Sequence, residues 1–166
     1  MKKVLIDASS AIILFKSGLF DKLTQTYYIV MAKAVCGELT QEGYPGAEVF
    51  REYCSDKDRV LQLPNHGEAD ISQLGRGEKN TIRHYIRGNG EFIVIDDGKG
   101  AAYCRDNRIP YINALLFPRI LYVSGDMAET DYHHKTEMIL RVGRYSQKII
   151  DYAARCSKDK LEFFLP

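Results

Sequence analysis

The stretch that decides the fold is VLIDASS, residues 4–10, in which a short apolar run ends in a carboxylate followed by small polar residues. The apolar run suits a buried strand, and the residues after it favour turns and the first turn of a helix. This pattern predicts a strand-to-helix junction of an α/β protein, the place where open parallel sheets bind their ligands. Asp7 has two interpretations here: it caps the helix that begins near Ser10, or it belongs to a functional site.

The same pattern returns in FIVIDDGKG, residues 92–100. It predicts a buried strand over 92–95 that ends in Asp96 and Asp97. Runs of β-forming residues at 27–31, 60–63 and 111–112 predict three further strands, with helical patterns between them. Because strands alternate with helices, we expect an α/β fold: a three-layer α/β/α sandwich around a mainly parallel sheet of about five strands.

The bulk composition is that of an ordinary soluble protein. The 166 residues suit one domain over 1–166, in which 126–166 form a C-terminal helical extension with helices over 130–141 and 146–158. The net charge of +1 gives no global attraction to nucleic acid, so such contacts would depend on local clusters of Arg and Lys. We find no signal peptide and no apolar run of membrane-spanning length, and the four scattered cysteines are typical of reduced thiols. These features predict a cytoplasmic protein without membrane contact.

Two glutamates lie on the apolar faces of predicted helices. Glu38 follows Val35 by three residues, and Glu78 follows the break GRG at 75–77 and precedes Ile82 by four. A first-turn glutamate stabilises its own helix through the macrodipole, but this does not explain why Glu78 faces the core. The first and fourth strands end at one edge of the predicted sheet, so Asp7 and Asp96 or Asp97 should share a cleft with both glutamates.

Carboxylates that converge in this way cannot all stay ionised without a cation, because like charges raise one another's pKa. Oxygen ligands select a hard ion, Mg²⁺ or Mn²⁺, and the sequence has no His/Cys set suited to zinc. Such an ion keeps open positions for phosphate and water. The implied reaction is hydrolysis of a phosphodiester.

Four pieces of the chain, in this order and spacing, resemble the PIN-domain nucleases. They are VLIDAS at 4–9, VCGEL at 35–39, GRGE at 75–78 and IDDGKGA at 95–101, and the resemblance runs from residue 1 to about 116. It implies the α/β/α sandwich, metal-dependent cleavage of RNA and often a toxin role with an antitoxin protein as partner. It also implies that four acids bind the metal: Asp7, Glu38, Glu78 and either Asp96 or Asp97. Asp97 aligns slightly better with the last ligand of the family, whereas Asp96 lies nearer the end of the strand.

The chain departs from this family in two places. NALL at 113–116 stands where the family often has Gly-Thr-Leu-Gly, so no hydroxyl-bearing site residue carries over from this loop. The segment from Asp126 is longer than a minimal toxin needs, which leaves homodimerisation or docking of another partner open as its role.

Two functions therefore compete. The first is a Mg²⁺- or Mn²⁺-dependent endoribonuclease in which Ser9 and Ser10 cap the first helix and the catalytic residues are Asp7, Glu38, Glu78, Asp96 and Asp97. The second is a non-catalytic α/β module that binds protein or RNA. Three basic residues flank the predicted cleft and are candidates for holding RNA phosphates, although a solvated helix face explains them equally well: Arg83, Arg87 and Arg105.

Overall fold

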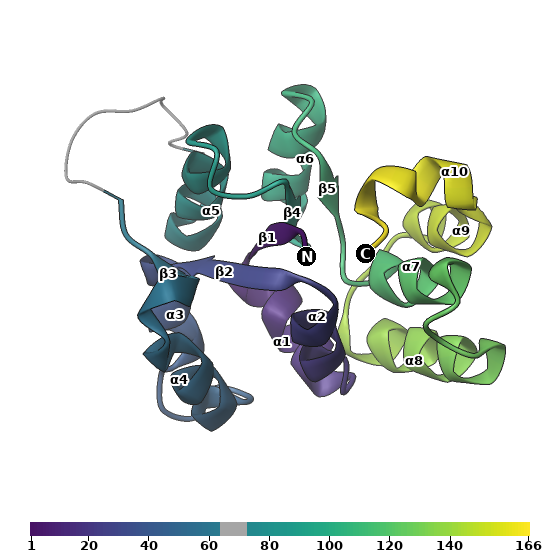
Figure 1. Cartoon of the computed structure of the whole chain (residues 1–166), viewed down its shortest axis with the longest axis horizontal. Helices are drawn as coiled ribbons and strands as arrows, with labels where there is room; N and C mark the ends of the chain where they lie inside the picture. Colours follow the sequence, from purple (N-terminus) through teal and green to yellow (C-terminus); the bar gives the residue numbers. More distant parts are fainter. Residues whose placement is uncertain (64–72) are drawn as a thin grey trace.

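A five-stranded parallel sheet forms the centre of the molecule (Figure 1). The computed structural model describes residues 1–63 and 73–166. In this part of the chain the strands are β1 (Lys3–Ile6), β2 (Tyr28–Ala32), β3 (Val60–Leu61), β4 (Phe92–Val94) and β5 (Tyr111–Ile112). Their order across the sheet is β3-β2-β1-β4-β5, and every neighbouring pair is parallel.

Helices cover both faces of the sheet, which confirms the three-layer α/β/α prediction. The helices of the described residues are α1 (Ala8–Lys16), α2 (Phe20–Thr26), α3 (Lys33–Leu39), α4 (Ala47–Ser55), α5 (Arg76–Ile86), α6 (Gly98–Asp106), α7 (Leu116–Ser124), α8 (Glu129–Val142), α9 (Gln147–Arg155) and α10 (Lys158–Leu161). There are also two 3-10 turns in the described residues: η1 (Lys57–Arg59) lies between α4 and β3, and η2 (Glu162–Phe164) follows α10. None of these helices combines the length and apolar character needed to cross a lipid bilayer.

The alternation of side chains along each strand divides the core in two. On β1, Val4 and Ile6 face the larger cluster with α1–α3 and α7, whereas Leu5 faces the smaller cluster with α5 and α6. Successive strand residues point to opposite faces, and both faces are buried here. This explains why residues 4–6 of β1 and all of β4 are continuous apolar runs rather than alternating ones.

The C-terminal helices pack beside β5 and α7 and close the end of the larger cluster (Figure 1). Lys135 Nζ donates a hydrogen bond to the Ser17 carbonyl oxygen at 2.9 Å. The rings of Phe164 and Phe92 pack edge to face, with 5.1 Å between their centroids. The helix predicted over 146–158 ends earlier, at Arg155, because Cys156 is extended and its carbonyl accepts from Arg119 Nε at 3.0 Å. A separate helix, α10, begins at Lys158. The break turns the chain end back toward the sheet.

Gly46, at the start of α4, offers a test of this packing. Its φ is +75°, and an added Cβ would meet the Phe15 ring at 2.8 Å. We expect Gly46→Ala to lower the free energy of unfolding by about 2–4 kcal/mol, from left-handed strain together with steric overlap. Gly43→Ala is the matched control, since Gly43 has φ +83° but no atom within 4 Å of an added Cβ. Gly43→Ala should lower the free energy of unfolding by about 1–2 kcal/mol, because only the left-handed backbone strain applies there. If urea titrations show equal losses of unfolding free energy for Gly46→Ala and Gly43→Ala, steric overlap with Phe15 does not contribute.

Candidate active site

The candidate site lies at the carboxyl edge of the sheet, between β1 and β4. The chain leaves β1 toward β2 on one side and returns to β4 on the other, so this is the point where the strand order reverses. Ligands of open α/β sheets bind in the crevice at such a point. Asp7 directly follows β1, Asp96 follows β4 after one residue, and the Asp7 N–H donates to the Val94 carbonyl at 3.1 Å.

Asp7 is fully buried, and its two carboxylate oxygens have different environments. Oδ1 accepts from the Ser10 N–H at 2.8 Å and thereby caps α1. Oδ2 is buried and has no hydrogen-bond partner among the described residues. The capping interpretation is therefore confirmed for Oδ1, whereas the role of Oδ2 in a functional site stays a prediction. The prediction that Ser9 and Ser10 cap α1 is wrong, because Asp7 occupies the N-cap position and its geometry suits that role.

Asp96 is held by three donors. Its Oδ2 accepts from the Ser10 hydroxyl at 2.7 Å and the Ala114 N–H at 2.9 Å, and its Oδ1 accepts from the Tyr145 hydroxyl at 2.5 Å. Ser10 thus bridges the two acids, with its N–H on Asp7 and its hydroxyl on Asp96. These contacts fix the orientation of the Asp96 carboxylate.

Burial is the main cause of the raised pKa values of Asp7 and Asp96. Burial raises the pKa of the Asp7 carboxyl from 3.8 to about 7, and the negative charge of Asp96 adds to the rise. Burial also raises the pKa of Asp96, although hydrogen bonds from Ser10, Tyr145 and Ala114 oppose this effect. Two carboxylates that are costly to ionise together favour a cation between them.

The two glutamates meet where α3 packs against the first turn of α5. A Cβ on Gly77 would lie 3.4 Å from Glu38 Oε2, so the small residue makes room for this carboxylate. Glu78 is in the same first turn. Burial and then the negative charge of Glu78 raise the pKa of Glu38, and the charge of Glu78 also contributes to the raised pKa of Asp7.

Asp97 has a different environment from its neighbour. It is the N-cap of α6, where its Oδ1 accepts from the Gly100 N–H at 2.8 Å. Of the neighbouring acids Asp96 and Asp97, Asp96 is the one whose negative charge contributes to the raised pKa of Asp7. The assignment of the fourth metal ligand to Asp96 or Asp97 stays a prediction.

The three arginines predicted to flank the site lie on or at the end of two helices, α5 and α6. Arg83 is half-buried on α5, and its Nε has no partner among the described residues. Arg87 is the C-cap of α5, at the opposite end of that helix from Glu78. Arg105 lies on α6 and lines the same pocket as Asp96.

Tyr145 is the residue of this site that sequence patterns did not reveal. It lies between α8 and α9, 49 residues after Asp96 in the chain, in a segment without a recognisable motif. The loop after β5 carries no hydroxyl in NALL, yet it contributes the Ala114 N–H to the same carboxylate. Only the folded chain reveals either contact.

Residues 3–116 match the PIN-domain family, and they make up more than half of the chain. The chain belongs to the PIN-domain family. PIN domains are generally nucleases, and they typically use divalent metals. Neither the curated proteins nor the solved structures contain a match to the chain.

The site of this PIN domain suits a hard cation in its chemistry. The acids of the site offer only oxygen atoms as metal ligands. Asp7 Oδ2 is buried and accepts no hydrogen bond from the described residues. Within residues 1–63 and 73–166, no three His, Cys, Asp or Glu side chains are grouped closely enough to enclose an ion. Mg²⁺ often takes only one or two carboxylates from the protein, together with waters and substrate phosphates. The pair Asp7 and Asp96 therefore fits such an ion, and the four-carboxylate ligand set stays a prediction.

Proposed function

We propose that this PIN domain is a Mg²⁺- or Mn²⁺-dependent endoribonuclease that hydrolyses RNA phosphodiesters at the carboxyl edge of its sheet. The observation that carries the proposal is the buried pair Asp7 and Asp96, bridged by Ser10, with Asp7 Oδ2 unpartnered. A buried carboxylate oxygen without a donor is unfavourable unless a cation or a proton meets it.

Each acid would have a definite task. Asp7 would hold the cation through Oδ2 alone, because Oδ1 is committed to the α1 cap. Asp96 would face the same ion from a carboxylate that Ser10, Ala114 and Tyr145 hold in place. Glu38 and Glu78 would extend the negative field toward α3 and α5, with Asp97 as the alternative fourth ligand.

When bound, the divalent cation neutralises charge on the phosphate and makes water more acidic. The chain's own contribution is orientation, since hydrogen bonds and helix caps fix both aspartates before substrate arrives. Such preorganisation avoids rearrangement during the reaction.

The test is cleavage of a mixed RNA pool by the purified protein with Mg²⁺, with Mn²⁺ and with EDTA. We expect cleavage in both metals, none in EDTA, and cleavage by Asp7→Asn that is about a thousandfold slower than by the wild type. If both proteins bind RNA and neither cuts it, the non-catalytic module is the correct function.

A toxin role, with an antitoxin protein as partner, belongs to the same proposal. Its support is the resemblance to PIN-domain toxins, and its test is growth during expression. We expect the wild-type chain to arrest growth and Asp7→Asn to permit it. Equal growth with both chains would argue against a toxin.

The hydroxyl of Tyr145 provides a further prediction. Tyr145→Phe removes the donor to Asp96 Oδ1 and keeps the ring that packs on Gly143. Because partners that orient metal ligands typically change affinity 10–100-fold, we expect Mn²⁺ to bind about tenfold more weakly in calorimetry. Tyr122→Phe is the matched control, since Tyr122 is held by ring stacking on Tyr132. Equal Mn²⁺ affinities in both variants would remove Tyr145 from the site.

A further inference from the structure

A groove with a volume of about 730 Å³ lies between α6 and α9 and includes Asp96 among its lining residues. We call it the α6–α9 groove. One wall is α6, and the other is formed by residues 144–152 of the C-terminal extension, with Asn113 and Leu116 between them. Its volume is within the range of pockets that hold small ligands, so it has room for nucleotide units beside the candidate site.

The charged side chains that line the α6–α9 groove are mostly basic, whereas the candidate site beside it is acidic. Arg105, whose Nε is paired with Asp106 Oδ1 at 3.1 Å, lines the groove from α6, and Arg144 and Lys148 line it from the opposite wall. All three side chains are exposed, and Asp96 is the only acid among the described residues that line the groove. A chain with net charge +1 therefore concentrates three cations around one groove. This arrangement fits a polyanion whose backbone runs toward the acids.

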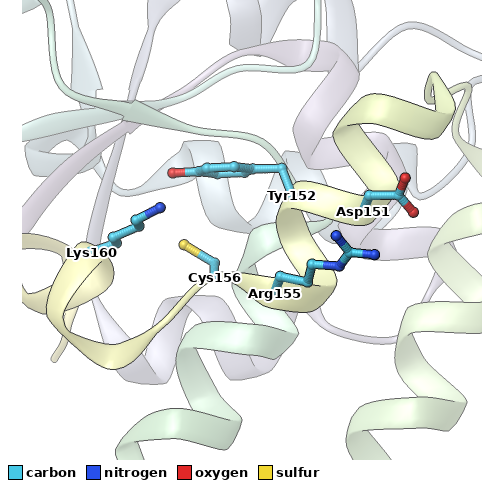
Figure 2. A pocket seen from close by; sticks show the side chains of 5 residues that line it. All are labelled: Asp151, Tyr152, Arg155, Cys156 and Lys160. Atoms are coloured by element: carbon cyan, nitrogen blue, oxygen red, sulfur yellow. The ribbon is translucent and has the colours of Figure 1, made fainter.

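Aromatic rings accompany these cations. Tyr111 and Tyr152 line the groove, and Tyr152 is 51% exposed. Tyr152 also borders a smaller cavity of about 250 Å³, where the Lys160 ammonium lies 5.9 Å from its ring centroid (Figure 2). Basic side chains that follow a backbone, together with aromatic rings for unpaired bases, are the features by which proteins bind single-stranded nucleic acid.

We propose that the α6–α9 groove binds the single-stranded RNA segment that adjoins the phosphodiester to be cut. Arg105 on one wall and Arg144 and Lys148 on the other hold the phosphates, and Tyr152 stacks on an unpaired base. The proposal rests on the proposed nuclease function, and it gives the C-terminal extension a role as one wall of the substrate site.

Binding is measured with Asp7→Asn protein, so that the probe stays intact. The probe is a fluorescently labelled single-stranded RNA 12-mer of mixed sequence. In this Asp7→Asn background, we expect the double substitution Arg144→Ala with Lys148→Ala to weaken RNA binding about tenfold at ~0.1 M salt. It should also reduce the slope of log K against log salt concentration by about 1.4. The matched control is Arg141→Ala with Lys158→Ala, which removes the same charge from exposed positions of α8 and α10 outside the groove.

Stacking is measured separately with 2-aminopurine in the same RNA. The fluorescence of this base is quenched when it stacks on an aromatic ring, and Tyr152→Leu should relieve the quenching and weaken binding about tenfold. A duplex of the same sequence should bind more weakly than the single strand, because its bases are already stacked on one another.

The outcomes separate this inference from the nuclease proposal. Equal affinities in the groove pair and the control pair would overturn the groove as an RNA site, as would no RNA binding even at low salt. RNA binding that needs the groove, in a wild-type protein that cuts no RNA with either metal, would support the groove and reject the nuclease.

Discussion

Asp7→Asn is expected to lower the rate of RNA hydrolysis by about a thousandfold while leaving the fold intact, the scale reported for removal of one preorganised electrostatic group. Asparagine keeps an oxygen that can accept from the Ser10 N–H, so the α1 cap survives. What it removes is the negative charge at the buried Oδ2 position. Single-turnover cleavage rates at saturating Mn²⁺ measure the effect on chemistry.

Asp7→Ala is the informative companion, because it removes both the charge and the cap. It should lose activity to the same extent and also lower the free energy of unfolding by about 1 kcal/mol relative to Asp7→Asn. Activity in Asp7→Asn within tenfold of wild type would mean that the charge at Oδ2 is not used in catalysis.

Metal-free protein should lose stability as the pH rises between about 4 and 7, and Asp7→Asn should not show this component. The folded-state pKa of Asp7, about 7, lies above its ordinary value of 3.8. Folding therefore favours protonated Asp7: its contribution to stability is fully present below about pH 4 and is lost as the pH rises through the folded-state pKa. The size of the loss is on the order of 4 kcal/mol by pH 8.

Urea titrations of both proteins in EDTA, from pH 4 to pH 8, measure this difference. Asp7→Asn should become progressively more stable than wild type across that range. Mg²⁺ at 100 times its Kd should then return about 2.7 kcal/mol to the wild-type protein at pH 8 and have little effect on the variant. A stability difference that stays constant with pH would show that Asp7 ionises normally in the folded chain.

Much of this fold could be predicted from local patterns. The apolar runs at 4–6 and 92–94 are β1 and β4, and the order of strands and helices predicted a parallel sheet with both faces covered. A strand buried on both faces must be apolar throughout, so its position is visible in the sequence. β3 is shorter than the predicted run at 60–63, because strand ends depend on pairing with neighbours rather than on composition.

The candidate site could be predicted less completely. Asp7, Glu38 and Glu78 stand out because carboxylates on apolar faces are unusual. Tyr145 has no such signal, since its contact with Asp96 depends on how the loop between α8 and α9 folds against β4. Asp7 caps α1 with Oδ1 and leaves Oδ2 for the proposed site, so the two roles do not exclude each other. A choice between these two roles cannot be made from residue type alone.

The pairing of β1 with β4 also constrains the order in which the site forms. Val4 pairs with Phe92, so the chain must close a loop of roughly ninety residues before Asp7 and Asp96 meet. Contacts this distant in sequence are slow to form, because the entropy of loop closure is lost before the contacts are made. A nascent chain therefore carries no assembled pair of Asp7 and Asp96 until β4 has left the ribosome and docked beside β1.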